Sequence, residues 1–203
     1  PTFGSGATWN GSRLTTPSDT GWNNQIIYST PNFGGLSANV HYQFGEQTAA
    51  GMRSKNNVGL NVLYFGGPLS LVGFYERAQV NNPAPNSVIP TTTNWMLGGT
   101  YDFKIVKLYA TYGQSKSKND VAVSGWVPGK NKTYSLGLDV PVSGTTGTFK
   151  AAAARTKAEW NDGNASATRT TYTLGYDHFL SKRTDVYGAV MYDRIKWTES
   201  KSG

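Results

Sequence analysis

The sequence predicts an all-β protein in which about ten strands follow one another as an antiparallel, up-and-down sheet. Three observations support this prediction. Large apolar side chains recur at every second position within segments of about ten residues, which places them on one face of a strand. Short and long connecting segments alternate along the chain. Finally, no segment shows the 3.6-residue apolar period of an amphipathic helix.

The two-residue alternation is clearest between residues 36 and 44. Its apolar positions are Leu36, Ala38, Val40, Tyr42 and Phe44, and polar residues stand between them. The same pattern recurs at 57–64, 94–103, 106–113, 133–140 and 171–178. It is weaker near 69–78, 148–158 and 185–195, where small residues such as Ala151 to Ala154 make the two faces alike. These segments are also expected to be strands, with a less sharply defined register.

The connecting segments alternate in length. The short ones are 31–35, 66–68, 104–105, 141–147 and 180–184. Longer polar stretches rich in Asn, Ser, Thr, Gly and Pro lie near 45–55, 79–93, 116–131 and 159–168. Tight turns join antiparallel neighbours, so the sequence predicts five consecutive hairpins with all their short turns at one end.

Composition limits the class of protein. The chain has 203 residues and no Cys, which is enough for one domain, and that domain has no disulfides. No run reaches the 18 or more apolar residues of a membrane-spanning helix. The net charge of +7 would suit nucleic acid, anionic lipid or anionic solutes. No basic run reaches five residues, and Lys116, Lys118, Lys130 and Lys132 are interpreted as a solvated loop rather than a nucleic-acid patch.

A meander of ten strands has one continuous apolar face that something must cover. No predicted helix does so, and a soluble sandwich would normally use shorter strands with Greek-key connections. Strands of about 9–11 residues with aromatic residues near both ends of the apolar stripe are typical of a barrel in an outer membrane. The expected membrane-interface aromatics are Tyr42, Phe44, Trp95, Phe103, Tyr134, Tyr172 and Tyr176. Lipid is therefore the expected cover.

Two segments also resemble a known family. The first, Asn23–Gly35 (NNQIIYSTPNFGG), is similar to the strand and periplasmic turn after the constriction loop of trimeric general diffusion porins from Gram-negative outer membranes. The second, Tyr176–Tyr187 (YDHFLSKRTDVY), is similar to a late strand, turn and following strand of the same porins. The number of hairpins between the two segments is the number that the family would place there.

The resemblance implies a transmembrane barrel of sixteen strands, of which this chain would supply strands six to fifteen. Residues 1–203 would then be one incomplete domain. Within it, 1–21 would end the constriction loop, 22–195 would hold ten strands and 196–203 would begin the last outer loop. It further implies a homotrimer in contact with outer-membrane lipid and lipopolysaccharide. The function implied is passive diffusion of small hydrophilic solutes and ions, with a mild preference for anions.

Charges on the wall and on an inward-folded loop set ion selectivity in such a channel. The expected pore-lining residues are Asn39, His41, Glu76, Asp102, Lys107, Asp139, Lys150, Asp177 and Asp193. The constriction candidates are Arg13 and Asp19, which the resemblance places in the loop, and Arg155, which would face the pore if its strand slipped by one residue. In the family, an inward Arg often stands at the place that Ile27 occupies here.

Catalysis, cofactors and metals are not expected. The only histidines are His41 and His178, without Cys and without the spacing of a zinc site. Ser181 lies near His178 in a turn with no sign of a nucleophile elbow. No nucleic-acid partner is expected. Two alternatives remain open at this point, an outer-membrane barrel acting as an adhesin and a soluble β-sandwich that binds carbohydrate.

Overall fold

The computed structural model describes residue 22 and residues 24–45, 56–79, 90–119, 129–160 and 165–199. These residues form ten strands and no helix. The strands are β1 (Gln25–Ser29), β2 (Leu36–Gln43), β3 (Asn57–Gly66), β4 (Leu69–Gln79), β5 (Pro90–Asp102), β6 (Lys107–Asn119), β7 (Gly129–Pro141), β8 (Gly147–Trp160), β9 (Ala165–Ser181) and β10 (Thr184–Glu199).

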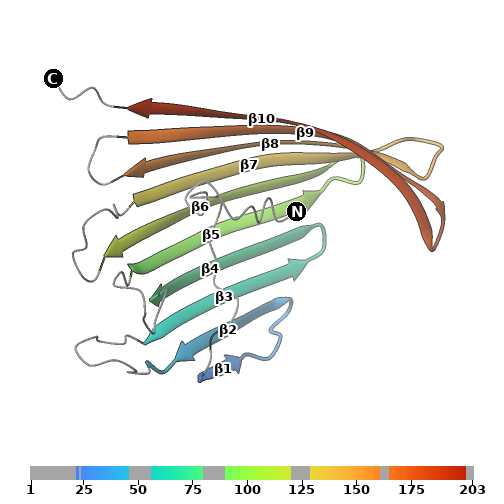
Figure 1. Ribbon diagram of the computed structural model, residues 1–203. Coiled ribbons are helices and arrows are strands. Elements are labelled where there is room, and N and C mark those ends of the chain that lie inside the picture. The colour runs from blue at the N-terminus through green and yellow to red at the C-terminus, as the bar shows by residue number, and fades with distance from the viewer. Residues whose placement is uncertain are drawn as a thin grey trace.

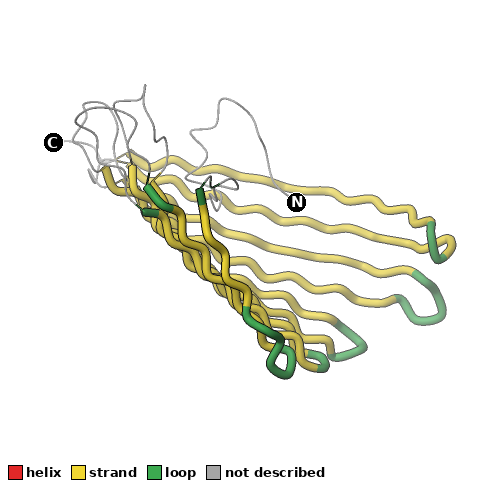
Figure 2. The backbone as a smooth tube through the Cα atoms, turned by 90° about the horizontal axis from the view of Figure 1, so that it is seen from below, coloured by secondary structure: helices red, strands yellow, loops and turns green. Residues whose placement is uncertain are grey.

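All ten strands belong to one antiparallel sheet in chain order, from β1 at one edge to β10 at the other (Figure 1). Seen from the end, the sheet bends across its width into an open trough (Figure 2). The up-and-down all-β prediction is confirmed. The two edge strands do not pair with each other, so the described sheet is not a closed barrel.

The described connections between strands lie together at one end of the trough (Figure 2). The shortest are residues 67–68 and 182–183. In the 103–106 turn, Lys104 has a φ of 69°, and its backbone N–H donates to Asp102 Oδ1 at 2.7 Å. This side-chain contact holds a non-glycine residue in the left-handed region that such residues seldom adopt.

The strands run further than the sequence pattern predicted. The long stretch expected at 159–168 is wrong, because β8 continues to Trp160 and β9 begins at Ala165, with Glu159 opposite Ser166. β10 likewise continues to Glu199, past the predicted boundary at residue 195. One face of these extensions is apolar: Ala158 and Ala167 pack with Trp160 and Ile195, and the rings of Trp160 and Trp197 lie 5.7 Å apart. Pairing with the neighbouring strand carries them on as sheet.

Burial within the described chain is the reverse of that in a soluble domain. The only buried hydrophobic residues there are Ala78, Ala158 and Ala167. Many large apolar side chains are exposed instead, among them Leu97 at 62% and Leu136 at 68%. A contiguous exposed apolar surface marks an interaction site. In the part of the chain that the structure describes, no helix is long and apolar enough to cross a membrane.

Candidate functional site

The candidate site is the concave face of the sheet. Register defines this face, because residues directly opposite one another on paired strands point the same way. Asn39 pairs with Asn61, and Asn61 pairs with Phe74. These side chains, together with Trp22 and His41, line a hollow of about 900 Å³ on the inside of the trough. By this register, all nine pore-lining positions predicted from the sequence point to the same face of the sheet as Asn39, Asn61 and Phe74.

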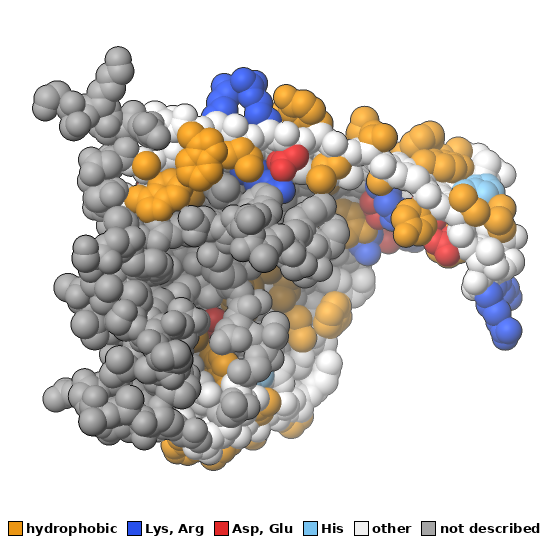
Figure 3. Space-filling model, in the orientation of Figure 1, with side chains coloured by type: hydrophobic (Ala, Val, Ile, Leu, Met, Phe, Trp, Pro, Cys, Tyr) orange, Lys and Arg blue, Asp and Glu red, His pale blue; other side chains and the backbone are white. Residues whose placement is uncertain are grey.

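Four of these positions form one row of alternating charge across neighbouring strands. Asp102 of β5 is opposite Lys107 of β6, Lys107 is opposite Asp139 of β7, and Asp139 is opposite Lys150 of β8. Acidic and basic side chains lie close together in the recess below the upper strands (Figure 3). Opposite charges facing each other across a sheet stabilise the pairing. The row is therefore largely self-compensating.

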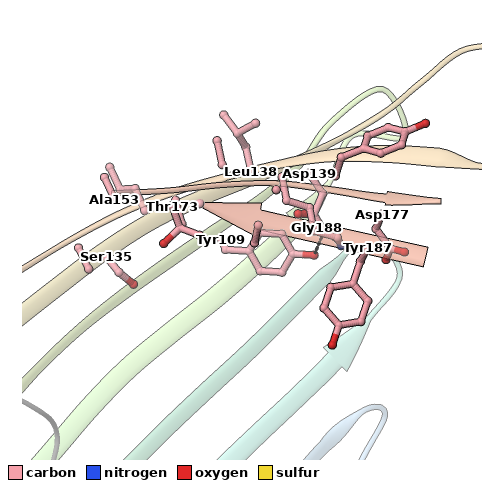
Figure 4. A pocket seen from close by; sticks show the side chains of 18 residues that line it. Tyr109, Ser135, Leu138, Asp139, Ala153, Thr173, Asp177, Tyr187 and Gly188 are labelled. Atoms are coloured by element: carbon pink, nitrogen blue, oxygen red, sulfur yellow. Dashed lines mark hydrogen bonds and ion pairs between the residues drawn. The ribbon is translucent and has the colours of Figure 1, made fainter. Parts of the chain in front are cut away.

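Asp139 is the best-connected carboxylate of that row. Its Oδ2 accepts hydrogen bonds from the Tyr109 hydroxyl at 2.8 Å and from Lys150 Nζ at 3.2 Å. Lys107 Nζ lies 5.4 Å from the centre of the Tyr109 ring, within the range of a cation–π contact. Tyr109, Asp139 and Asp177 border one hollow of about 450 Å³ (Figure 4). The hydrogen bonds to Asp139 and the contact of Lys107 with the Tyr109 ring hold these charged side chains in defined positions.

A second ion pair joins β9 to β10. Arg169 Nε donates to both carboxylate oxygens of Asp193 at 3.0 Å, and Arg169 Nη2 lies 2.8 Å from Asp193 Oδ2. The Thr171 hydroxyl donates to the same carboxylate at 2.9 Å. Sequence reasoning named Asp193 but missed Arg169, because the alternating segment it recognised began at Thr171. Extending the alternation of Thr171 and Thr173 backwards by one step would have found it.

Neutral polar pairs cover much of the remaining concave face. Asn39 Nδ2 donates to Asn61 Oδ1 at 2.7 Å, and Asn94 Nδ2 donates to Glu76 Oε1 at 3.2 Å. Hydroxyl pairs join β6 to β7 and β7 to β8: Thr111 with Ser135 at 2.6 Å, and Thr133 with Thr156 at 2.9 Å. This face therefore presents amides, hydroxyls and paired charges, groups that suit contact with water.

Trp22 is an inward-facing residue that sequence reasoning did not single out. Its ring meets the His41 ring edge-on, with 6.4 Å between centroids. A side chain on Gly59 would begin 3.3 Å from the Trp22 ring, so glycine leaves the room that the indole occupies. An isolated residue before the first strand has no periodic pattern that could reveal it. Arg13 and Asp19, with the predicted constriction-loop segment 1–21, lie outside the described residues.

Arg155 is not a concave-face residue. Its strand does not slip: Arg155 is opposite Tyr134 on one side and Thr170 on the other, on the convex face. Lys150, five residues earlier, has the opposite facing and is opposite Asp139. The four alanines between them left the register ambiguous in the sequence, and cross-strand pairing decides it. The expectation that slippage would bring Arg155 to a constriction is corrected.

The predicted interface aromatics share the convex face or the adjoining turn. The ring of Trp95 packs edge-on against that of Tyr112 with 5.3 Å between centroids, and Tyr42 against Phe44 with 5.0 Å. The rings of Tyr176 and Phe149 are tilted, with 4.8 Å between centroids. Phe103 lies in a turn, 4.5 Å from Tyr101. Tyr134 and Tyr172 are both about half exposed on strands β7 and β9. Their position at a membrane interface stays a prediction.

Two kinds of site considered from the sequence can be checked on the described residues, a metal site and a Ser181–His178 pair. The described residues contain no group of three or more His, Cys, Asp or Glu side chains that could hold a metal ion. His178 Nδ1 is 3.3 Å from the Tyr176 hydroxyl, whereas Ser181 Oγ accepts from the backbone N–H of Arg183 at 3.1 Å. Ser181 and His178 are thus engaged with other groups. The chemistry available to the concave face is electrostatic and hydrogen-bonding.

Known proteins are similar to this chain in sequence and in fold. Outer membrane porin protein 32 of Delftia acidovorans is 34% identical, over 86% of this chain and 47% of its own length. An outer membrane porin protein of Bordetella pertussis is 24% identical, over 84% of this chain and 52% of its own. The structure of an anion-selective porin from Comamonas acidovorans has a TM-score of 0.68 at 33% identity, and the match covers 86% of this chain and 50% of that one. OmpT of Vibrio cholerae in a trimer form has a TM-score of 0.68 at 17% identity, covering 95% and 65%.

The chain spans about half the length of the curated relatives it matches. The sequence profile of the Gram-negative porin family matches residues 2–197. The match covers nearly the whole chain and agrees with the up-and-down sheet and its polar concave face. The protein therefore belongs to the Gram-negative porin family and is a β-stranded protein of the outer membrane.

Proposed function

We propose that the complete protein is a porin, a water-filled channel for passive diffusion of small hydrophilic solutes and ions, and that this chain supplies part of its wall. The observation that carries the proposal is the difference between the faces. One face of a single continuous sheet holds paired charges, amides and hydroxyls, while the other holds exposed Leu, Val, Phe and Tyr side chains. Such a sheet fits between water and lipid.

Cysteine scanning of the alanine segment in β8 tests this arrangement, since the chain itself has no Cys. Ala152 and Ala154 have the concave facing, and Ala153 has the convex one. In the complete protein reconstituted in planar bilayers, a charged, membrane-impermeant thiol reagent should reduce the conductance of the Ala152→Cys and Ala154→Cys channels. The Ala153→Cys channel should keep its conductance. Equal effects at all three positions would contradict a pore-facing concave wall.

We also propose a mild preference for anions in the complete channel. The support for this preference is the similarity to an anion-selective porin. The described concave strands give no such support, since they do not carry a surplus of basic side chains. Their basic side chains, Lys107, Lys150 and Arg169, are outnumbered by acidic ones. A salt-gradient reversal potential of the complete protein is the test. A sign that favours cations would overturn the proposed preference and leave the channel proposal intact.

Two further parts of the proposal concern assembly and chemistry. We propose that the complete protein forms a homotrimer in contact with outer-membrane lipid and lipopolysaccharide, in line with the trimer form of OmpT. We infer that it acts as a channel and not as an enzyme, supported by the family match and by the separate engagement of Ser181 and His178. A heat-sensitive band at three times the monomer mass on a gel tests the trimer.

A further inference from the structure

The convex face of β7–β10 changes character along each strand. From the short-turn end, β7 presents Leu138, Leu136, Tyr134 and then Lys132, and β8 presents Ala151, Ala153, Arg155 and Lys157. β10 presents Val190, Tyr192, Arg194 and Lys196. Only β9 differs, with Leu174 and Tyr172 followed by the hydroxyls of Thr170 and Thr168. An apolar surface is thus followed by a basic one on neighbouring strands.

The basic positions of β8 and β10 flank the hydroxyls of β9. Thr170 lies between Arg155 and Arg194, and Thr168 lies between Lys157 and Lys196. Strands β8 and β10 are two inter-strand spacings apart, about 10 Å. That distance lets one anionic group lie over the threonine row and receive hydrogen bonds from both sides. Basic side chains also project outward at the β10 edge of the sheet (Figure 3).

Nothing on the described chain neutralises most of this charge. Lys132 and Lys157 are directly opposite each other, an arrangement that destabilises a sheet unless an anion screens it. Lys157 forms an ion pair with Glu159 at 2.6 Å. Among the described residues, no carboxylate forms an ion pair with Lys132, Arg155, Arg194 or Lys196. The cluster is therefore short of negative charge.

An apolar groove adjoins this cluster. A hollow of about 800 Å³ extends from Leu69 on β4 to Leu174 on β9, and at its β8 end the small side chains of Ala151 and Ala153 stand between larger ones on β7 and β9. Its convex lining includes Leu136, Leu138, Tyr172 and Leu174. Arg155 and Thr170 are the next convex residues along the same strands. Groove and cations therefore form one continuous surface, apolar at one end and basic at the other.

We propose that this surface binds a phosphorylated lipid of the outer leaflet, the lipopolysaccharide of the proposed setting. A lipid phosphate lies over Thr168 and Thr170 and is held by Arg155 and Arg194, with Lys132 and Lys157 beside it. One acyl chain lies in the groove over Ala151 and Ala153. Arg binds phosphate with two parallel hydrogen bonds, and basic clusters beside apolar surface recognise lipid headgroups. The inference rests on the proposed function, since that sets the basic end at the outer side.

The chemistry of the surface selects this occupant. A nucleic acid or free phosphate would use the cations and leave the apolar groove exposed. An uncharged acyl chain would use the groove and leave the cations unpaired. A phosphorylated lipid satisfies both parts at once, with its headgroup and tail in the order that the strands present.

The test uses the complete protein in detergent and lipid A bisphosphate as the probe, titrated by native mass spectrometry. The double variant Arg155→Gln/Arg194→Gln should weaken binding by about tenfold or more, because each charge-assisted hydrogen bond to phosphate is among the stronger ones. The matched control Arg77→Gln/Lys116→Gln removes two convex cations on β4 and β6 that do not line the groove and are not neighbours of Thr168 or Thr170, and should leave the affinity within about twofold. Equal weakening by both double variants would mean unspecific charge attraction and overturn the site.

Two further arms separate the parts of the surface. Ala153→Leu fills the groove with apolar volume and should weaken lipid A binding without changing the weak binding of inorganic phosphate. Dephosphorylated lipid A should bind the unaltered protein at least about tenfold more weakly. Equal binding of the two lipids, or displacement of lipid A by millimolar inorganic phosphate, would overturn the proposal. Conductance and reversal potential should stay unchanged in every variant, so loss of lipid binding and loss of channel function are distinguishable.

Discussion

The two faces of β8 treat basic residues in opposite ways. Lys150, on the concave face, donates a hydrogen bond to Asp139 at 3.2 Å. Arg155, five residues further on and on the convex face, has Tyr134 and Thr170 as its cross-strand neighbours. On the concave face Lys150 and Arg169 form ion pairs with carboxylates of the protein, whereas the convex face leaves cations for a partner outside it. Facing, rather than the total count of charges, decides what a charge does in such a sheet.

This difference changes the meaning of the net charge of +7. Taken as a property of the whole chain, a positive balance suggested a channel that attracts anions. The strands place most of the surplus elsewhere. The convex basic residues are Arg77, Lys116, Lys118, Lys130, Lys132, Arg155, Lys157, Arg194 and Lys196. The surplus therefore faces outward, and composition alone is a poor guide to the pore.

The largest expected effect comes from one charge placed on each face of β8 at neighbouring positions. Ala151→Arg puts the charge among Leu138 and Leu174 on the convex face, and Ala152→Arg puts it on the concave face. The lipid-facing variant should lose about 2–4 kcal/mol of unfolding free energy, while the water-facing variant should lose about 0.5 kcal/mol or less. Urea unfolding of the complete protein in phospholipid vesicles measures both.

Equal losses of unfolding free energy at the two alanines would mean that the two faces of β8 meet the same solvent. A larger loss for Ala152→Arg would reverse the assignment of pore and lipid sides. Both variants add the same side chain to adjacent residues of one strand, so helix or strand propensity cannot account for a difference between them.

The second effect concerns the ion pairs of the two faces. Asp193→Asn removes the carboxylate held by Arg169, whose side chain is only 11% exposed. The variant should cost about 1–3 kcal/mol, as for other hydrogen bonds between charged groups. Glu159→Gln removes the partner of Lys157 on the convex face, where both side chains are about half exposed. It should cost about 0–0.5 kcal/mol in the same vesicle assay.

The double variant Arg169→Gln/Asp193→Asn separates the contribution of the ion pair from the other contacts of the two residues. If the pair itself supplies the stability, the coupling energy of the cycle should exceed about 0.5 kcal/mol. Additive losses would instead show that each residue acts through other contacts.

The sequence predicted those parts of the fold and of the concave face that follow the apolar alternation, and it missed residues that are placed by their cross-strand neighbours. The apolar alternation predicted the sheet and gave Lys150 and Asp139 their correct common face, although Ala151 to Ala154 carry no pattern. Trp22 and Arg169 were missed, because one precedes the first strand and the other lies beyond the apolar stripe. Lys116 and Lys130 were assigned to a loop, yet they face each other as strand residues. Polar strand ends gain order from their neighbours, which a single sequence does not display.

A smaller effect is expected from the hydroxyl pair of Thr111 and Ser135, whose oxygens are 2.6 Å apart on the concave face. Thr111→Val keeps the shape and removes the hydrogen bond, and it should cost about 0.5–1.5 kcal/mol. Thr170→Val makes the same change on the convex face, away from any hydroxyl pair, and should stay within about 0.5 kcal/mol. A greater loss for Thr170→Val in urea titrations would contradict the view that side-chain pairing is a feature of the concave wall.

The smallest effect is on ion selectivity and bears most directly on the two faces. Lys150→Met exposes the Asp139 carboxylate to the pore, and Lys157→Met removes a cation from the convex face. An ion passing about 7 Å from a unit charge in water changes energy by about 0.6 kcal/mol, and salt at about 0.1 M roughly halves that. Lys150→Met should therefore shift the permeability ratio towards cations by about 1.5-fold to 2-fold in reversal-potential measurements. Lys157→Met should leave the ratio unchanged, because the sheet and the surrounding lipid separate it from the ion path. A shift from Lys157→Met as large as that from Lys150→Met would mean that convex charges reach the pore, and the division between pore-facing and outward-facing charge would fail.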